Sequence, residues 1–252
     1  MIKRKIHIFL TIGAFSSVIL VGNVVAFFTE TEQRTNAFTV GKVTIDINED
    51  FEQNQIVYPE ETVEKNPSVE NIGKNTAYVF LEVDVPKAKV TLLNDSGQFL
   101  YPQYDADGKM IENYSTTSKS LQEIFSITSS AKENETLKTV VYGDSSANIF
   151  SYHSTWSQLE NKTIRSGKDY NTYVFYYSTP LKSGNSTETL FDKIKLKKFI
   201  DSEFSDNEES SVTEVSVRAY AIQADNLENM TNTDTSQAVF YEELYDIIKN
   251  RL

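Results

Sequence analysis

The stretch Val79-Phe80-Leu81-Glu82-Val83-Asp84-Val85 decides the fold of this chain. Aliphatic residues occupy every second position, and Phe80, Glu82 and Asp84 stand between them. A period of two places successive side chains on opposite faces of a β-strand. The stretch therefore predicts a strand whose aliphatic face is covered by a core.

The same alternation recurs at 43–47 and at 215–221, and the aromatic run 173–177 has large side chains on both faces, which predicts a central strand. Several such strands, separated by long intervals, favour two antiparallel sheets packed face to face. The turn signals Asp95-Ser96-Gly97 and Asp107-Gly108 predict two hairpins, around residues 98–101 and 109–111.

Three segments have apolar residues at helical spacing and predict helices. Leu121, Ile124 and Phe125 follow Ser118 and Ser120; Leu190, Phe191 and Ile194 follow Ser186 and Thr187; Phe240, Leu244, Ile247 and Ile248 follow Asp234 or Thr235 as the expected cap. The predicted fold class is mainly β, an antiparallel β-sandwich with a few peripheral α-helices. Polar stretches at 132–136, 201–211 and 226–235 are expected to be loops.

The N-terminus has the layout of a secretory signal. Lys3, Arg4 and Lys5 precede an apolar run from Ile6 to Ala26. The small and compact residues that end this run predict cleavage between Ala26 and Phe27. The alternative is a retained membrane anchor, since the run is long enough to span a bilayer. The expected organisation is a signal peptide at 1–26, an N-terminal extension at 27–42 and a single β-sandwich domain at 43–252.

The charge and the cysteine content exclude several classes of partner and of functional site. The chain has 24 basic and 36 acidic residues, for a net charge of −12, and removal of residues 1–26 takes away three basic residues and no acidic one, which leaves −15. A negative field repels phosphate backbones, so we expect no nucleic-acid partner. The chain has no cysteine, which excludes disulfides, thiolate metal sites and a cysteine nucleophile. The acidity also makes any self-assembly sensitive to salt and pH.

Catalytic motifs are scarce. After the expected cleavage, His153 is the only histidine, and neither a His-Glu-x-x-His helix nor a Gly-x-Ser-x-Gly turn occurs. A site of the Ser-His-Asp kind through His153 is conceivable, but we expect this side chain to pack against Trp156 and Tyr152. The sequence therefore predicts that the protein is not an enzyme.

No cofactor is expected, and one loop is a weak candidate for calcium. Asp105-Ala106-Asp107-Gly108 is similar to the start of a calcium-binding loop, but Thr116 stands where the twelfth-position glutamate belongs. A simple turn is the alternative for Asp105 and Asp107. The basic cluster at 193–198 is interpreted as the solvated face of an amphipathic segment.

The order of several short motifs along the chain resembles the TasA/camelysin family of exported Gram-positive proteins, which a dedicated signal peptidase, SipW, matures. The matching stretches are Phe28-Thr29-Glu30-Thr31-Glu32, Asn36 to Val43, Lys65 to Gly73, Ala77 to Phe80, Trp156, Tyr173 to Tyr177, Leu181 to Gly184, Ser186-Thr187, Leu190 to Asp192 and Ala219 to Asp225.

This resemblance implies a jelly-roll β-sandwich that forms extracellular matrix or biofilm fibres. In fibre-forming members the freed N-terminal segment fills a groove in the next subunit as a missing strand. The residues that match this candidate donor strand are Phe27, Phe28, Thr29, Glu30, Thr31 and Phe38. A flexible tail, or a strand that pairs within its own chain, is the alternative.

The expected partners are therefore a second copy of the chain in a head-to-tail homopolymer, the signal peptidase during export and other matrix proteins. The expected location is the cell surface or the extracellular matrix. Two other functions stay open. One is a non-polymerising surface module for adhesion or binding. The other is a camelysin-type metallopeptidase, for which the chain has few suitable ligands.

Overall fold

The computed structural model describes residues 38–40, 43–50, 58–100, 102–115, 121–133, 135–141, 149–165, 169–200, 214–225, 227 and 236–251. The expected signal peptide, the cleavage point between Ala26 and Phe27, the donor residues Phe27 to Thr31 and the expected loop at 201–211 lie outside these ranges. So does most of the expected loop at 226–235.

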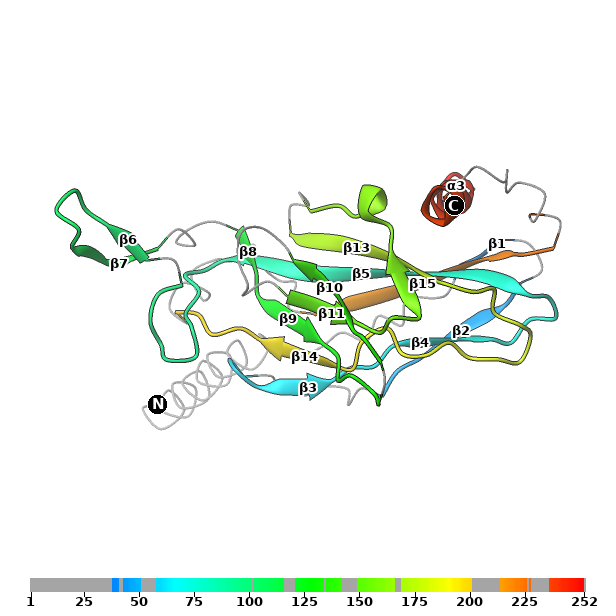
Figure 1. The fold of residues 1–252 in the computed structure, drawn as a ribbon, viewed down its shortest axis with the longest axis horizontal. Coiled ribbons are helices and arrows are strands. Elements are labelled where there is room, and N and C mark those ends of the chain that lie inside the picture. The colour runs from blue at the N-terminus through cyan, green and yellow to red at the C-terminus, as the bar shows by residue number, and fades with distance from the viewer. Residues whose placement is uncertain are drawn as a thin grey trace, which may run out of the picture.

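The first sheet is built around one long strand, β5, which spans 13 residues. The strands of this sheet, in spatial order, are β1 (Phe38–Val40), β15 (Ser216–Gln223), β5 (Ala77–Lys89), β13 (Tyr170–Tyr177) and β12 (Trp156–Gln158), with β8 (Leu121–Glu123) paired to the end of β5 (Figure 1). These pairings are antiparallel except that of β1 with β15, which is parallel.

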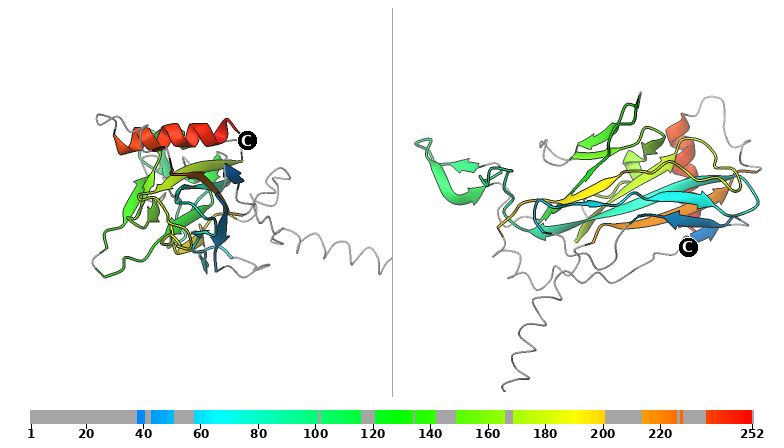
Figure 2. Two further views of the ribbon diagram at one scale, coloured as in Figure 1. Left: turned by 90° about the vertical axis from the view of Figure 1, so that its right-hand side faces the viewer. Right: turned by 90° about the horizontal axis from the view of Figure 1, so that it is seen from below.

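The second sheet faces the first, and two short ribbons complete the described strands. The second sheet consists of β10 (Lys138–Val141), β11 (Ile149–Tyr152), β9 (Phe125–Thr128), β14 (Lys193–Leu196) and β3 (Thr62–Glu64); the ribbons are β2 (Ile45–Asn48) with β4 (Ser68–Asn71), and β6 (Pro102–Tyr104) with β7 (Met110–Ser115). The β6–β7 hairpin projects from one end of the molecule (Figures 1 and 2).

The main core fills the space between the two sheets. Val79, Leu81, Val83 and Val85 of β5 are all buried in it, together with apolar residues of β9, β11 and β14. This arrangement confirms the expected antiparallel β-sandwich. The aromatic run in β13 is buried on both faces and lies inside the first sheet, as its sequence predicted.

The opposite face of the first sheet is covered as well, by the helix α3 (Gln237–Lys249) (Figure 2). Tyr78 and Phe80 of β5 pack edge-on against Tyr241, and Tyr241 stacks on Tyr176 with ring centroids 3.9 Å apart. The alternation in β5 therefore separates two cores, rather than one core from solvent.

Beside these rings, Glu82 is a buried carboxylate that joins the helix to the sheet. It accepts hydrogen bonds from the Tyr245 hydroxyl, from the Lys249 ammonium at 3.0 Å and from the Arg218 Nε at 2.9 Å. Burial by itself raises the pKa of Glu82, but the hydrogen bond from Tyr245 and the attraction of Arg218 outweigh it, so the pKa is lowered. Arg218 also pairs with Asp84, so the charges in this network compensate one another.

Two of the three predicted helices are wrong. In the first segment, the described residues 121–125 form β8 and the start of β9, and in the second, residues 186–192 are irregular until β14 begins. In the second segment the Leu190 amide donates to the Pro67 carbonyl at 2.8 Å and the Thr187 amide donates to the Val69 carbonyl at 2.8 Å. Since backbone donors are engaged by a distant part of the chain, the helical spacing of these apolar residues does not produce a helix.

The third predicted helix is confirmed as α3, the one α-helix within the described ranges. Its buried residues include Phe240, Leu244 and Ile248, as expected. The cap prediction was wrong, because Ser236, and neither Asp234 nor Thr235, occupies the N-cap and accepts from the Val239 amide. A short 3₁₀ turn, η2 (Glu160–Lys162), follows β12.

Both predicted turns are present. Gly97 closes the turn between the bridged residues Leu93 and Phe99, and Gly108 closes the turn between β6 and β7. Their φ angles of 76° and 78° lie in the left-handed region, which glycine adopts without steric cost.

Candidate functional site

The outer edge of β15 is a candidate interface. β15 pairs with β5 along its whole length, whereas β1 pairs only with Tyr220 to Ile222. Within the described ranges, no strand pairs with Ser216 to Ala219 on that side. Such an edge presents unpaired backbone donors and acceptors, which an added strand can satisfy.

The strand β1 covers the rest of this edge with a short contact. It spans three residues and runs parallel to β15 in a sheet that is otherwise antiparallel. Parallel pairs are slightly less stable per residue than antiparallel ones. Phe38, the last of the candidate donor residues, pairs in β1 with Tyr220 of its own chain. In the isolated molecule, residues 38–40 therefore form a strand that pairs within its own chain, which was the alternative to donation.

The calcium candidates lie at the tip of the β6–β7 hairpin. The Asp105 carboxylate accepts hydrogen bonds from the Asp107 amide at 3.0 Å and from the Lys109 amide at 2.8 Å, and both aspartates are exposed. Asp105 therefore stabilises the turn. Within the described ranges, no group of three or more His, Cys, Asp or Glu residues is placed to hold a metal ion.

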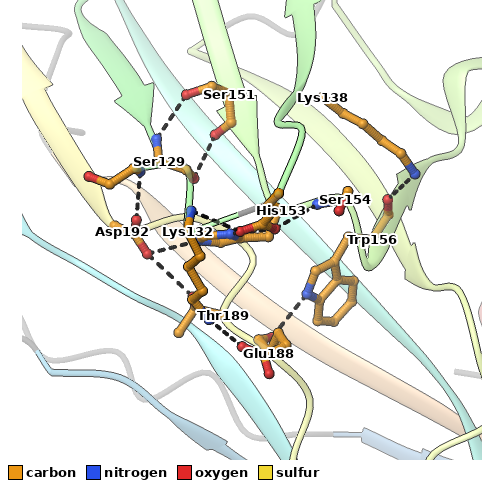
Figure 3. Close-up of polar contacts among 12 residues, drawn as sticks. Ser129, Lys132, Lys138, Ser151, His153, Ser154, Trp156, Glu188, Thr189 and Asp192 are labelled. Atoms are coloured by element: carbon orange, nitrogen blue, oxygen red, sulfur yellow. Dashed lines mark hydrogen bonds and ion pairs between the residues drawn. The ribbon is translucent and has the colours of Figure 1, made fainter.

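His153 lies in a cluster of polar side chains beside the second sheet (Figure 3). It follows β11 and is only 1% exposed. Its Nδ1 lies 2.9 Å from Glu135 Oε1, and its Nε2 lies 2.9 Å from Asp192 Oδ1. The sequence led us to expect this ring to pack against Trp156 and Tyr152, and it gave no sign of the two carboxylates from distant segments that its nitrogens contact.

Both carboxylates of this cluster are stabilised in their charged form. Burial by itself raises the pKa of Asp192, but hydrogen bonds from the Ser130 amide and from His153 outweigh it, and the net shift is downward. For Glu135, burial again raises the pKa, and the hydrogen bond with His153 is the largest of the contributions that lower it overall. The cluster therefore holds two carboxylates against one imidazole ring.

This geometry does not suit general base catalysis. A catalytic histidine needs one ring nitrogen directed at the group that it deprotonates. Both nitrogens of His153 already face carboxylate oxygens, and the ring is buried. The cluster instead joins three segments of the fold: the connection before β10, the end of β11 and the approach to β14.

In the basic cluster at 193–198, one lysine departs from the interpretation as a solvated face: Lys193, Lys195 and Lys198 are partly exposed, whereas Lys197 is buried. Lys197 is only 8% exposed, and it borders a pocket of about 260 Å³ together with Lys195 and Lys198. Lys195 Nζ lies 3.7 Å from Asp95, and Lys198 Nζ lies 3.0 Å from Glu60. Since these cations already face acidic side chains, the pocket is weakly adapted to an anionic ligand.

Sequence reasoning missed the roles of the buried Glu82 and of the partly buried Glu135 and Asp192. The sequence contains one indication for Glu82: a carboxylate inside a strong strand pattern either faces water or needs a buried partner. Glu135 and Asp192 had none, since they stand 18 and 39 residues from His153 along the chain.

No family model, no curated protein and no solved structure matches this chain. Among the helices of the described ranges, none combines the length and the apolar character that a membrane crossing requires.

Proposed function

We propose that this protein is a secreted structural subunit that assembles into extracellular fibres by strand donation between copies. The observation that supports the proposal best is the outer edge of β15, which β1 covers over three residues only. A strand donated by one copy can form hydrogen bonds with this edge in a second copy. Each subunit then donates its own strand and accepts a strand from another subunit. Such a head-to-tail contact does not close and grows into a filament.

The register of β1 defines where the donated strand lies. Phe38 pairs with Tyr220, so a strand that continues this register toward lower numbers places residues 34–37 beside Ser216 to Ala219. In the proposed fibre, the extension 27–42 of one copy takes this position on β15 of the next. Main-chain hydrogen bonds then extend over the whole outer edge, which one short parallel contact does not achieve.

A disulfide that fixes β1 on its own β15 tests the proposal. Thr39 pairs with Ala221, and paired residues of adjacent strands lie about 5 Å apart, within the range that a disulfide spans. Because the natural chain has no cysteine, Thr39→Cys with Ala221→Cys introduces the only thiols. The chain that begins at Phe27 is expected to form fibres when reduced, and to stay monomeric by electron microscopy and sedimentation when oxidised first.

Oxidation after assembly gives a second result. Fibres formed under reducing conditions and then oxidised are expected to show covalent multimers on a non-reducing gel, because β1 of one copy then faces β15 of the next. The matched control is Asp46→Cys with Glu70→Cys, a pair in the β2–β4 ribbon that leaves β1 free. Equal fibre formation by both oxidised variants would exclude strand donation, and a natural chain that never forms fibres would exclude the structural function.

A further inference from the structure

The His153 cluster has a geometry that only one protonation state satisfies completely. Carboxylate oxygens accept hydrogen bonds, and a neutral imidazole has one N–H donor and one acceptor nitrogen. His153 has a carboxylate oxygen 2.9 Å from each ring nitrogen. With a proton on both nitrogens, the ring donates to Glu135 and Asp192 at once. With a proton on one nitrogen, a lone pair faces one of these oxygens.

The two carboxylates differ in what else holds them. Asp192 also accepts from the Ser130 amide at 2.8 Å and from the Thr189 hydroxyl at 3.3 Å. Among the described residues, the other donors to Glu135 are the amides of Ser154 and Lys132, both at 3.3 Å, near the limit for a hydrogen bond. Glu135 therefore depends more on His153, and it is the partner that separates when one ring proton is lost.

The charged groups around the ring also favour a positive charge on it. Beyond Glu135 and Asp192, the cluster contains Glu188, whose carboxylate pairs with the Lys132 ammonium (Figure 3). Lys132 and Glu188 are both about half exposed. The Lys138 ammonium, also drawn in Figure 3, donates instead to the Trp156 carbonyl at 2.7 Å and to the Ser157 hydroxyl at 2.9 Å. Of the two ammonium groups, only Lys132 pairs with a carboxylate, so the positive charge of an imidazolium compensates a local excess of negative charge.

We propose that His153 is a proton-dependent clamp: with both ring nitrogens protonated it holds Glu135 and Asp192 together, and loss of one proton releases the segment that contains Glu135. This segment connects β9 to β10, and β10 is an edge strand of the second sheet. The clamp therefore controls how firmly this edge is held, independently of the proposed fibre function.

The clamp can be tested on the chain that begins at Phe27, in which His153 is the only histidine. Nitrogen-15 NMR between pH 5 and 9 reports the protonation of each ring nitrogen. Hydrogen exchange of the Ser130 and Ser154 amides, corrected for intrinsic rates, reports the two carboxylate contacts. We expect Ser154 protection to fall about tenfold as His153 loses a proton, the effect of losing one hydrogen bond to a charged group. The remaining proton is expected on Nε2, facing Asp192, with Ser130 protection reduced less.

Two variants separate the clamp from general effects of pH. Glu135→Ala removes the oxygen that both His153 Nδ1 and the Ser154 amide contact, so its Ser154 protection is expected to be low and constant from pH 5 to 9. Glu133→Gln, an exposed substitution on the same segment, is expected to behave like the natural chain. Ser154 protection that does not change with the protonation of His153, or a pH response in Glu135→Ala equal to that of Glu133→Gln, would overturn the proposal.

Discussion

Burial lowers the pKa of the Lys197 ammonium to about 8, although attraction to Glu123 opposes the shift. The unfolded chain keeps the ordinary value of 10.5, so between these two values the unfolded chain binds more protons. The free energy of unfolding therefore rises with pH in this interval, and the cost of burying the charge is fully present below pH 8.

This sign gives a prediction for Lys197→Met, which removes the charge. From pH 7 to pH 10, the free energy of unfolding of the natural chain should rise relative to that of the variant by roughly 2–3 kcal/mol. Urea unfolding of both proteins at the two pH values measures the change. Lys193→Met, at a partly exposed position of β14, is the control, and its difference from the natural chain should stay constant. A constant difference for Lys197→Met as well would contradict the prediction.

At the scale of the element, α3 is attached to the first sheet by aromatic packing and by the hydrogen bonds that Glu82 accepts. Glu82 is 3% exposed and Tyr245 is 7% exposed, so water cannot easily replace a lost donor. Burial raises the pKa of the Tyr245 hydroxyl, and so does the adjacent Glu82 charge. The hydroxyl therefore stays protonated and remains a donor through the whole neutral range.

Removal of this one donor should weaken the attachment of α3. Tyr245→Phe keeps the ring and deletes a hydrogen bond to a buried charge, so we expect a loss of about 1.5–3 kcal/mol in the free energy of unfolding. Hydrogen exchange of the α3 amides should accelerate at the same time. Tyr170→Phe, at a position 40% exposed, should change stability by less than about 0.5 kcal/mol. Equal effects of the two substitutions would show that the contact does not stabilise the helix.

The same scale shows how far local pattern predicts structure. Alternation identified β2, β5 and β15, and helical spacing identified α3. The same helical spacing at 121–125 was misleading, because Glu123 faces inward there and accepts from the Asn171 side chain at 2.7 Å and the Tyr173 hydroxyl at 2.6 Å. A short apolar run fits either structure, and its partners in space decide between them.

At the scale of the whole molecule, acid should destabilise the fold through a few carboxylates. Glu82, Glu135 and Asp192 have pKa values below their ordinary values of 4.5, 4.5 and 3.8 in the folded chain, because hydrogen bonds and adjacent cations outweigh burial. A lowered pKa stabilises the folded state above the ordinary value, and this stabilisation is lost as pH falls through the folded value.

We therefore expect the urea midpoint to fall from pH 5 to pH 3. Asp192→Asn removes one of these groups and should show a shallower decline, whereas Glu243→Gln, on the exposed side of α3, should follow the natural chain. A midpoint that stays level down to pH 3, or equal slopes for the two variants, would contradict the assignment of the acid response to these carboxylates.

The sequence by itself determined the fold class, the two glycine turns and the C-terminal helix, because these follow from the periodicity and conformational freedom of neighbouring residues. Only the tertiary structure decided that 186–194 forms no helix, that β5 separates two cores, and that His153 lies between Glu135 and Asp192. The physical reason is that a buried polar group, whether a backbone amide or a side chain, needs a partner wherever the fold supplies one. Such partners lie tens of residues away, and local pattern does not specify them.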